Sequence, residues 1–600
     1  MNRKELKDLK AIGAEQLKLA ILAGTGMVQA RQDYLNKINV FPVPDADTGT
    51  NMAMTLSSIA DGIAKQQFAD ISTLFAVAAD SALQGARGNS GAILAQFFQG
   101  ICENTNKAKK LSLDNFADII NGGACAAQEA LAEPREGTIL TVLREFAHSA
   151  HNKKDKYTSL WGLFLGALKD AEYALKQTTK QLEVLKKAGV VDAGAQGFID
   201  FLHGIKDYVE TGELPELHLK DSEKTADEPK NIDLVTQYRY CTECLIIGEN
   251  INQAELRRAL TLIGDSLIVA GSKTKTKIHI HVNEPNKLFE YCLRYGRLEN
   301  QKADDMIQQQ KLHNKHPRVA IMTDSGADIP ADLIEKLDIH MVPLSIQFGE
   351  TSYIDKISLT SEQFYEKLKS TTENPKTSQP SASEFNRLYH YLNSHYEGGI
   401  LALHMSGNIS GTLAASKLAA KQITDHPIRV IDTINACGAE GLLVTYAAKL
   451  AQDGLDIDEI TKKIKHQIPK TTLHSAFPNL EYGVRGGRVS KKKKWIADLL
   501  RLSPVIGLDA DGYLKPQGVL RGRSKLDSKL ADFIFARYSK HKKYRLCVIH
   551  ANSPAIGQSL LSMLLSHYQH VEDSYLVSCG AVIGSHSGPG CLAVAMQVLD

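Results

Sequence analysis

The sequence has almost no excess of charge of either sign, which argues against a protein that binds nucleic acid. Seventy Lys and Arg residues against 68 Asp and Glu residues leave a formal net charge of +2 over 600 residues. A protein that binds a polyanion usually carries a clear basic excess. We therefore expect no nucleic-acid partner.

Long apolar runs and an ordered cysteine pattern are also lacking. No apolar run reaches the length of about 18 residues that a bilayer span needs, and the start, MNRKELKDLK, does not read as a signal peptide. Nine cysteines, an odd number scattered over a long chain, argue against a disulfide framework. We expect a cytoplasmic protein without a transmembrane segment.

The length implies several domains, because single hydrophobic cores stop growing at about 250–300 residues. The segments that we predict are an all-α domain (1–210), a linker (211–230), a small α+β domain (231–303), a second linker (304–318) and a two-lobed α/β domain (319–600). The first domain rests on about eight segments with apolar residues at helical spacing, among them 123–132 and 160–187.

The richest motif of the first domain is NVFPVPDADTGTNM, at residues 39–52. Two carboxylates, Asp45 and Asp47, lie one residue apart in a loop stiffened by prolines, and hard oxygen ligands of this kind suit Mg²⁺. Asn39 is a weaker candidate ligand. The alternative is a turn that only caps a helix, which is common for an Asp-Thr-Gly sequence.

Residues after the carboxylates lead into a helix, and a helix N-terminus beside a divalent cation suits a polyphosphate. Glycine lets backbone approach phosphate in a second loop, GARGNSG at residues 85–91. Arg87 in this loop would meet a phosphate or pair with a carboxylate. The candidates for nucleotide binding are Asn39, Thr48, Gly49, Thr50, Asn51, Met52, Gly88, Asn89, Ser90, Gly91, Asp192 and Gly194.

These two stretches, with VDAGAQG at residues 191–197, resemble the ADP-binding subunit of dihydroxyacetone kinase in the form carried by bacterial fatty acid kinases. The resemblance covers roughly the first third of the chain. It implies a barrel of antiparallel helices that binds ATP or ADP with Mg²⁺ at one end, where Asp192 and Gly194 would close the pocket.

The small α+β domain contains a strictly alternating strand, KIHIHVN, at residues 277–283. His279 and His281 therefore share one face of the strand, where they are placed to chelate a transition metal. Cys241 on a neighbouring strand would be a third ligand, because thiolate with imidazoles favours Zn²⁺. Glu243, Cys244 or water would complete the site. The alternative is a solvated polar face.

The same domain resembles the middle domain of the fatty acid kinase, whose Cys and His-x-His positions correspond to Cys241, His279 and His281. The resemblance strengthens the expectation of zinc at these three residues. It does not say whether the role of the metal is structural or regulatory.

The last domain alternates strands and helices, which predicts an α/β fold with parallel sheet in two lobes. Several strands end in small, hydroxyl-rich loops, where ligands of open α/β sheets bind. Hydroxyls, an Arg and a His gathered there would suit a small anion such as a carboxylate. Helix capping is the alternative role for any single Ser or Thr, and Lys491 to Lys494 fit a solvated helix face better than a membrane patch.

Five such loops lie at residues 323–330, 377–381, 406–412, 486–490 and 584–590, and in this order they resemble the DegV family of fatty-acid-binding proteins. The resemblance implies that Thr377, Ser378 and Ser410 bind the acyl carboxylate. It places Arg488 and His586 at the exposed end, where the carboxylate becomes a phosphate.

The combined resemblances imply a self-contained fatty acid kinase that turns ATP and a bound fatty acid into ADP and acyl phosphate. The fatty acid carboxylate is already ionised at neutral pH, so catalysis needs alignment and charge neutralisation rather than a general base. Asp45, Asp47, Arg488 and His586 are the catalytic candidates, and an acyltransferase would consume the product. The sequence leaves open whether transfer occurs within one chain or in a homodimer.

Two alternative functions belong to other classes of protein. The first is a kinase for dihydroxyacetone or a similar small polyol, although the partner domain that anchors that substrate through a histidine is not found. The second is a lipid-binding or regulatory protein with a dormant kinase domain, against which the intact Asp45, Asp47 and Gly-Asn-Ser-Gly loop argue.

Overall fold

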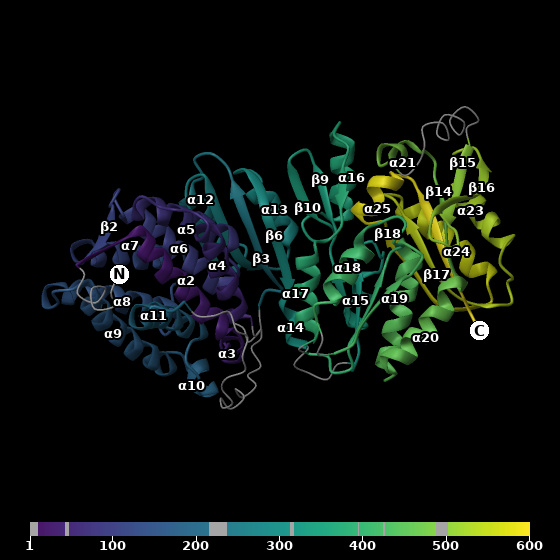
Figure 1. The fold of residues 1–600 in the computed structure, drawn as a ribbon. Coiled ribbons are helices and arrows are strands. Elements are labelled where there is room, and N and C mark those ends of the chain that lie inside the picture. The colour runs from purple at the N-terminus through teal and green to yellow at the C-terminus, as the bar shows by residue number, and fades with distance from the viewer. Residues whose placement is uncertain are drawn as a thin grey trace. The chain divides into compact units, whose positions relative to one another are not determined.

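The computed structural model describes residues 10–41, 47–214, 237–311, 317–393, 395–423, 426–487 and 502–600. The chain forms two compact units, Met1–Gln310 and Lys311–Asp600, and Figure 1 labels their elements. Within the described ranges, no helix combines the length and the apolar character that a membrane crossing requires.

The first unit begins with a helical domain, as predicted. Its principal helices are α2 (Ala14–Ala30), α3 (Gln32–Lys37), α4 (Thr48–Ala64), α5 (Ile71–Gly85), α6 (Gly88–Asn104), α7 (Leu113–Glu129), α8 (Ile139–Lys153), α9 (Leu160–Gln181), α10 (Glu183–Ala188) and α11 (Ala193–Thr211). A short antiparallel pair, β1 (Ala11–Gly13) and β2 (Lys110–Ser112), and the 3₁₀ turn η1 (Lys154–Lys156) complete it. One apolar core runs through these helices, which stabilises them by burying their apolar faces.

Helix α7 begins ten residues before the predicted start of the segment 123–132. Ser112 caps it with a side-chain hydrogen bond from the Asn115 amide. Gly122 and Gly123 suggest a helix start in the sequence, but they lie inside α7. A Cβ atom on Gly123 would lie 2.8 Å from the ring of Phe97, so the glycine serves close packing of α7 on α6.

The predicted helix over 160–187 is divided in two. Leu182 adopts an extended conformation between α9 and α10, and α10 ends at Gly189 in the left-handed region. The apolar periodicity continues across this break, so the break is not visible in the spacing of the residues.

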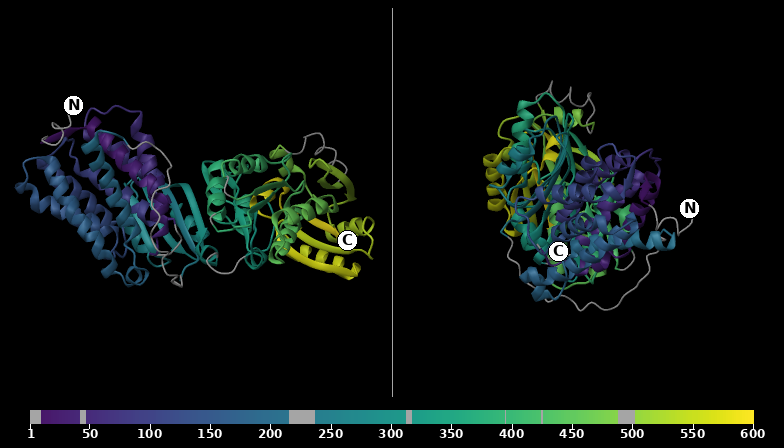
Figure 2. Two further views of the ribbon diagram at one scale, coloured as in Figure 1. Left: turned by 60° about the horizontal axis from the view of Figure 1, so that its bottom comes forward. Right: turned by 90° about the vertical axis from the view of Figure 1, so that its left-hand side faces the viewer.

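The middle part of the first unit is an antiparallel sheet with flanking helices. Its elements are β3 (Tyr240–Ile247), α12 (Gln253–Leu260), β4 (Asp265–Gly271), β5 (Lys275–Val282), α13 (Pro285–Cys292), β6 (Arg297–Asp305) and α14 (Met306–Lys311). The strand order is β4-β5-β3-β6. Leu245, Ile268 and Ala270 join the core of the helical domain, and Figures 1 and 2 show these teal strands beside the purple and blue helices.

The second linker, predicted over 304–318, is wrong for residues 304–311. Strand β6 continues to Asp305 because Asp305 pairs with Tyr240 of β3 and forms a 2.7 Å ion pair with Arg239. The Asp305 side chain then accepts hydrogen bonds from the Ile307 and Gln308 amides and starts α14.

The second unit is α/β, as predicted. Its first elements are β7 (Ala320–Asp324), α15 (Ala331–Lys336), β8 (Ile339–Val342), β9 (Ser345–Phe348), β10 (Thr351–Ile354), α16 (Ser361–Ser370), β11 (Lys376–Ser378), α17 (Ala382–Asn393), β12 (Ile400–His404), α18 (Thr412–Ala420), β13 (Ile428–Asp432), α19 (Cys437–Gln452) and α20 (Ile457–Gln467). The remainder are η2 (Ile468–Lys470), β14 (Thr471–Ala476), α21 (Glu481–Arg485), β15 (Leu502–Leu508), β16 (Leu514–Arg521), α23 (Leu526–Phe535), β17 (Lys543–His550), α24 (Pro554–His567), β18 (His570–Ser578), α25 (Ala581–Ser587) and β19 (Leu592–Leu599).

Two large sheets confirm the two lobes. The first lobe has a parallel sheet of order β13-β12-β7-β8. The second has the order β16-β15-β14-β19-β17-β18, in which β17 and β18 are parallel and the other neighbours antiparallel. The prediction of parallel sheet is therefore right for the first lobe and wrong for most of the second. Helix α19 contacts strands of both sheets.

The apolar segment 339–348 forms two strands, β8 and β9, in different sheets. Pro343 has no amide hydrogen to donate, so the ladder of β8 ends before it. Strand β9 then pairs with β10 and β11 in a small third sheet. This small sheet carries Thr377 and Ser378 on β11.

Candidate functional site

The starts of α4, α6 and α11 meet at one end of the helical domain. A Cβ atom on Gly88 would collide with the Asn51 side chain, so the first turns of α6 and α4 are in contact. A Cβ atom on Gly194 would lie 2.7 Å from the Ser90 hydroxyl, which brings the start of α11 to the same place. The structure therefore brings together four residues that the sequence predicts to bind nucleotide.

Backbone amides in the first turn of α6 are suited to binding a phosphate. Among the described residues, no hydrogen-bond acceptor lies against the backbone amides of Asn89 and Ser90, which occupy the first turn of α6. The next amide, that of Gly91, donates to the Arg87 carbonyl. Two adjacent unpaired amides at a helix start present partial positive charge to an anion.

Several other predicted residues are engaged in packing between helices. The Thr50 amide donates to the Asn36 Oδ1 atom at 3.0 Å, and the Thr50 hydroxyl accepts from Asn36 and Gln32. Gly49 lies against the backbone of α3, where a Cβ atom would not fit. Met52 is fully buried, with its sulfur against Gly197. Their direct contact with nucleotide stays a prediction.

Asp192 caps α11 from inside the protein. Its carboxylate accepts a hydrogen bond from the Ala195 amide at 2.8 Å, and the side chain is buried. Burial raises the pKa of Asp192 to about 6, although amide hydrogen bonds from Ala195, Ile139 and Gly194 oppose the shift. A carboxylate kept in such a place is typical of a functional site, because a bound cation would favour its charged form.

The predicted Mg²⁺ loop is described only in part. Asp45 lies outside the described residues, whereas Asp47 precedes the first residue of α4 and its carbonyl accepts from the Asn51 amide at 2.8 Å. Asn39 is buried close to the end of α3. Carboxylate and amide oxygens fit the hard-ligand chemistry of Mg²⁺, and Asp47 and Asn39 are the described residues that would hold it.

Cys241, His279 and His281 come together, as predicted from the strand alternation. Cys241 lies opposite His281 in the pairing of β3 with β5, and one ligand atom from each residue lies within 4.8 Å of the others. The face is not solvated, because His279 is 1% and His281 6% exposed. Burial lowers the pKa of His279 and so favours the neutral ring that a metal needs.

Each histidine is oriented by a carboxylate. His279 Nδ1 lies 3.1 Å from Glu243 Oε1, and His281 Nδ1 lies 3.0 Å from Asp265 Oδ1. The other nitrogen of the buried His279 ring, Nε2, has no hydrogen-bond partner among the described residues. This arrangement is typical of zinc sites, in which a carboxylate binds one ring nitrogen and the metal binds the other.

Glu243 also contacts residues outside the cluster of Cys241, His279 and His281. Its Oε1 atom accepts a hydrogen bond from the Gly88 amide at 2.6 Å, and Lys277 Nζ lies 3.0 Å from its Oε2 atom. Burial alone would raise the pKa of Glu243, but Lys277 and the hydrogen bond from His279 hold it well below its usual value. Cys244, the other predicted fourth ligand, alternates to the opposite face, beside Cys292.

The roles of Lys277 and Asp265 were not predicted from the sequence. A signal for Lys277 was present, since it precedes His279 by two residues on the same alternating strand and so shares its face. Asp265 approaches His281 through the pairing of β4 with β5, which contains a register shift between Asp265 and Ile268. A register shift of this kind has no marker in the sequence.

The second unit encloses a cavity of about 410 Å³. Its wall is mainly apolar and includes Leu344, Met405, Ile409, Leu473, Phe477, Leu480, Ile506, Leu508, Leu514, Ile549, Val582 and Ile583. Thr377, Ser378 and Ser410, which are predicted to bind the carboxylate, and His586, which is predicted to lie at the exposed end, all line this cavity. Arg488 and the segment Lys491 to Lys494 lie outside the described residues.

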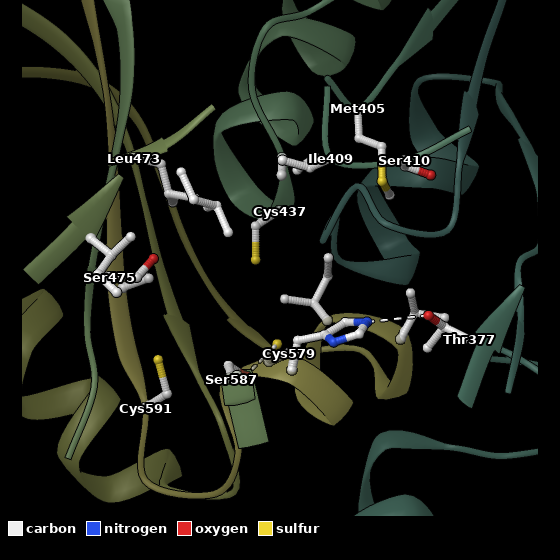
Figure 3. A pocket seen from close by; sticks show the side chains of 18 of the residues that line it. Thr377, Met405, Ile409, Ser410, Cys437, Leu473, Ser475, Cys579, Ser587 and Cys591 are labelled. Carbon is white, nitrogen blue, oxygen red and sulfur yellow. Dashed lines mark hydrogen bonds between the residues drawn. The ribbon is translucent and has the colours of Figure 1, made fainter. Parts of the chain in front are cut away.

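Thr377 and Ser410 lie on one side of the cavity, as Figure 3 shows. The Thr377 hydroxyl lies 3.1 Å from His586 Nε2, and the Ser410 hydroxyl lies 2.9 Å from that of Thr412. Leu473, Ser475 and Cys591 lie on the other side. The cavity thus pairs a polar end with a longer apolar part, the arrangement that an ionised acid with an apolar tail requires.

Three cysteines in the cavity wall were not anticipated from the sequence. Cys437 lies across the cavity from Thr377 in Figure 3 and donates a hydrogen bond to Asp328 Oδ2 at 2.9 Å. A hydrogen bond from Cys579 and burial raise the pKa of the Cys437 thiol well above its usual value. Burial likewise raises the pKa of the Cys591 thiol, so Cys437 and Cys591 are neutral thiols that behave as small apolar groups in the wall.

The chain combines a helical domain, a sheet that groups Cys241, His279 and His281, and a two-lobed domain around a mainly apolar cavity. Three family models match in that order: the DAK2 domain over residues 42–207, the FakA-like middle domain of fatty acid kinases over 237–313, and the DegV family over 318–598. The chain belongs to the DegV family through its last domain, which follows a DAK2 domain and a FakA-like middle domain.

Relatives resemble this chain over part of its length. Protein YloV of Bacillus subtilis is 32% identical over 302 residues, which cover 48% of this chain and 54% of that protein. An uncharacterised Staphylococcus epidermidis protein is 32% identical over 345 residues, or 53% of this chain and 62% of that one. The chain therefore spans little more than half the length of these relatives.

Solved structures also resemble part of the chain. DegV of Bacillus subtilis, described as a fatty acid binding protein, is 31% identical, with 47% of this chain and 100% of that chain covered and a TM-score of 0.44. The Thermotoga maritima protein TM841, described as having a fatty acid binding function, is 30% identical, with 47% and 100% covered and a TM-score of 0.42.

Proposed function

We propose that this protein is an ATP-dependent fatty acid kinase that phosphorylates the carboxylate of a fatty acid bound in its DegV-family domain. The main support is the cavity of the second unit, where a hydroxyl–imidazole pair lies at one side of a mainly apolar wall. A neutral apolar ligand would leave that pair without a function, whereas a carboxylate accepts hydrogen bonds from both.

The first unit supports the nucleotide half of the proposal. Asn89 and Ser90 offer their amides to phosphate oxygens, and Asp47 with Asp45 would hold magnesium. The ion would neutralise charge on the phosphates and so reduce repulsion of the incoming carboxylate. Thr377, Ser410 and His586 would fix the acyl oxygen for in-line attack, and the carboxylate needs no base to be reactive.

The apolar wall also suits the chemistry of the product. Acyl phosphates hydrolyse readily, so a chain buried among side chains such as Leu473 and Ile549 keeps water from the acyl carbon. Zinc at Cys241, His279 and His281 is part of the same proposal. Its donor set, two imidazoles and a thiol, fits a site completed by a fourth ligand. Phosphoryl transfer within one chain or across a homodimer would use the same groups.

The test is a transfer assay with purified full-length protein, magnesium and γ-labelled ATP. We expect label in a hydroxylamine-sensitive acyl product when oleate is added, and not when dihydroxyacetone or no acceptor is added. Label on dihydroxyacetone would favour the polyol kinase. Fatty acid binding without transfer of label to any acid would favour a lipid-binding protein with a dormant kinase domain and would overturn the proposal.

A further inference from the structure

A single buried carboxylate connects the predicted metal triad with the predicted phosphate loop. Glu243 comes from β3 and is 0% exposed. One of its oxygens, Oε1, lies 3.1 Å from His279 Nδ1 and accepts from the Gly88 amide at 2.6 Å. The hydrogen bond to Gly88 joins residues that are 155 positions apart in the chain.

The carboxylate has little freedom to move without its partners. Lys277, itself 1% exposed, lies 3.0 Å from Glu243 Oε2 and neutralises the charge, so no solvent is needed to stabilise it. The imidazole of His279 is packed edge-on to that of His281, with ring centroids 5.5 Å apart. A change in the position of the His279 ring therefore has to be followed by Glu243 or has to break a buried hydrogen bond.

The Gly88 end of the link is equally constrained. Gly88 adopts a φ of +59°, which only glycine accepts readily, and its α carbon faces the Asn51 side chain. It is the first residue of α6, so its amide orientation sets the direction of the first turn. The amides of Asn89 and Ser90, which we assign to phosphate binding, follow directly in that turn.

We propose that Glu243 is a positioning residue that couples metal binding at Cys241, His279 and His281 to phosphate binding at the start of α6. With a metal held by Cys241, His279 and His281, the position of the His279 ring would set that of the Glu243 carboxylate, and the carboxylate would set that of the Gly88 amide. The proposal rests on the proposed nucleotide function of this loop. It gives the metal a regulatory role, because a metal-free protein would present its phosphate donors less well ordered.

Coupling between two sites is reciprocal, which supplies a readout other than catalysis. In the full-length protein, we expect zinc loading to tighten Mg·ADP binding, measured by titration calorimetry, by about five-fold or more. Mg·ADP should tighten zinc binding, measured by competition with a chromophoric chelator, by the same factor. Amide hydrogen exchange of the peptide containing Gly88 should slow on zinc addition in the wild-type protein, without any substitution.

The variant Glu243→Gln tests the residue itself. Glutamine preserves the shape of the side chain but removes the charge that holds Lys277 and His279. Both binding sites should therefore remain, while the factor by which zinc tightens Mg·ADP binding falls toward one. The matched control is Glu255→Gln, which neutralises an exposed carboxylate on α12 of the same domain and should retain the wild-type factor. Zinc content and far-ultraviolet circular dichroism verify that each variant folds.

The results of these experiments distinguish the coupling proposal from the kinase proposal. Mg·ADP binding of equal strength with and without zinc would overturn the coupling and leave the kinase proposal intact. Full coupling in Glu243→Gln would overturn the role of Glu243. Failure of Mg·ADP to bind under any condition would overturn both. If Glu243→Gln does not fold, the wild-type calorimetry and exchange decide: zinc must both tighten ADP binding and protect Gly88.

Discussion

The hydroxyl of Thr377 and the Nε2 atom of His586 lie 3.1 Å apart in the wall of the apolar cavity, although 209 residues separate them in the chain. Thr377 comes from β11 of the small third sheet, and His586 comes from α25, which precedes the last strand of the second lobe. The fold therefore brings a predicted carboxylate ligand, Thr377, into contact with a predicted catalytic residue, His586, and the pair can be tested one atom at a time.

Removing the Thr377 hydroxyl should weaken fatty acid binding without changing the cavity. The variant Thr377→Val is close to isosteric and loses one hydrogen bond to the carboxylate, worth about 1–1.5 kcal/mol, so the Kd for oleate should rise about five- to ten-fold. Thr377→Ser keeps the hydroxyl and is the matched control. Equal affinities of the wild type and Thr377→Val, measured by calorimetry, would show that the carboxylate binds elsewhere.

The side of the cavity opposite Thr377 should limit the length of the acyl chain that the protein binds. Ser475 lies there, on β14, away from Thr377 in Figure 3. In Ser475→Phe the ring takes the space of the chain end, and overpacking of this kind costs about 1–3 kcal/mol. We expect binding of stearate to weaken by about ten-fold or more while binding of decanoate is preserved.

Ser475→Ala controls for the loss of the hydroxyl alone and should change neither affinity. Both acids are compared by displacement of a fluorescent fatty acid. Parallel loss of stearate and decanoate binding in Ser475→Phe would mean that the polar end, rather than the chain end, faces Ser475.

A substitution at Asp47 should reduce phosphoryl transfer without changing fatty acid binding. Asp47→Asn removes a charged ligand of the proposed magnesium ion, and loss of a group that supports a metal site costs at least about ten-fold in activity. Acyl phosphate formation should fall by that factor or more, while the Kd for oleate, set in the other unit, stays unchanged. Asp61→Asn, an exposed carboxylate on the same helix, should retain full transfer. Unimpaired transfer in Asp47→Asn would remove Asp47 from the site.

Local patterns were sufficient to predict much of the fold and of the metal triad. The alternation of KIHIHVN put His279 and His281 on one face, and the pairing of β3 with β5 places Cys241 opposite His281 as expected. The change from helical periodicity to strand–helix alternation likewise gave the helical and α/β classes. These signals are local, with a period of two or 3.6 residues, so one sequence is enough to read them.

Contacts that depend on register or on packing between distant segments could not be predicted in this way. The link from Glu243 to Gly88 requires knowing which face of the middle sheet meets the helical domain, and nothing in either segment specifies the other. The antiparallel pairing in the second lobe also could not be predicted, because it depends on which strands become neighbours in the sheet. Gly123 was misread because glycine marks a helix end and a close helix contact equally well.

Zinc binding should depend on the Cys241 thiol. We expect about one zinc per chain in the wild type, by mass spectrometry of the purified protein, as in a site with one thiolate and two imidazoles. Cys241→Ser replaces the thiolate with a hydroxyl, a poor zinc ligand, so zinc should be lost at a chelator concentration that the wild type withstands. Cys125→Ser, at an exposed cysteine of α7, should keep its zinc. Equal retention in both variants would exclude Cys241 as a ligand.

The Asp192 carboxyl should make the helical domain less stable as the pH rises. Its folded-state pKa of about 6 lies above the value of 3.8 that applies when it is exposed, so the folded protein holds the proton more tightly. The resulting stability is complete below about pH 4 and is lost as the pH rises through 6. Asp192→Asn keeps a cap acceptor without the charge. It should be more stable than the wild type at pH 8 by up to about 3 kcal/mol, with no difference at pH 4.

Unfolding in urea at the two pH values, followed by circular dichroism, measures this difference. The control is Asp70→Asn, which changes the exposed cap of α5, where hydrogen bonds from Thr73 lower the pKa of Asp70 and the sign should reverse. A destabilised Asp192→Asn at pH 8 would contradict the prediction. A carboxylate that costs stability is retained when a ligand uses it, so the same variant should bind Mg·ADP more weakly even though its folded state is more stable. Greater stability together with weaker nucleotide binding is an outcome that a purely structural cap would not produce.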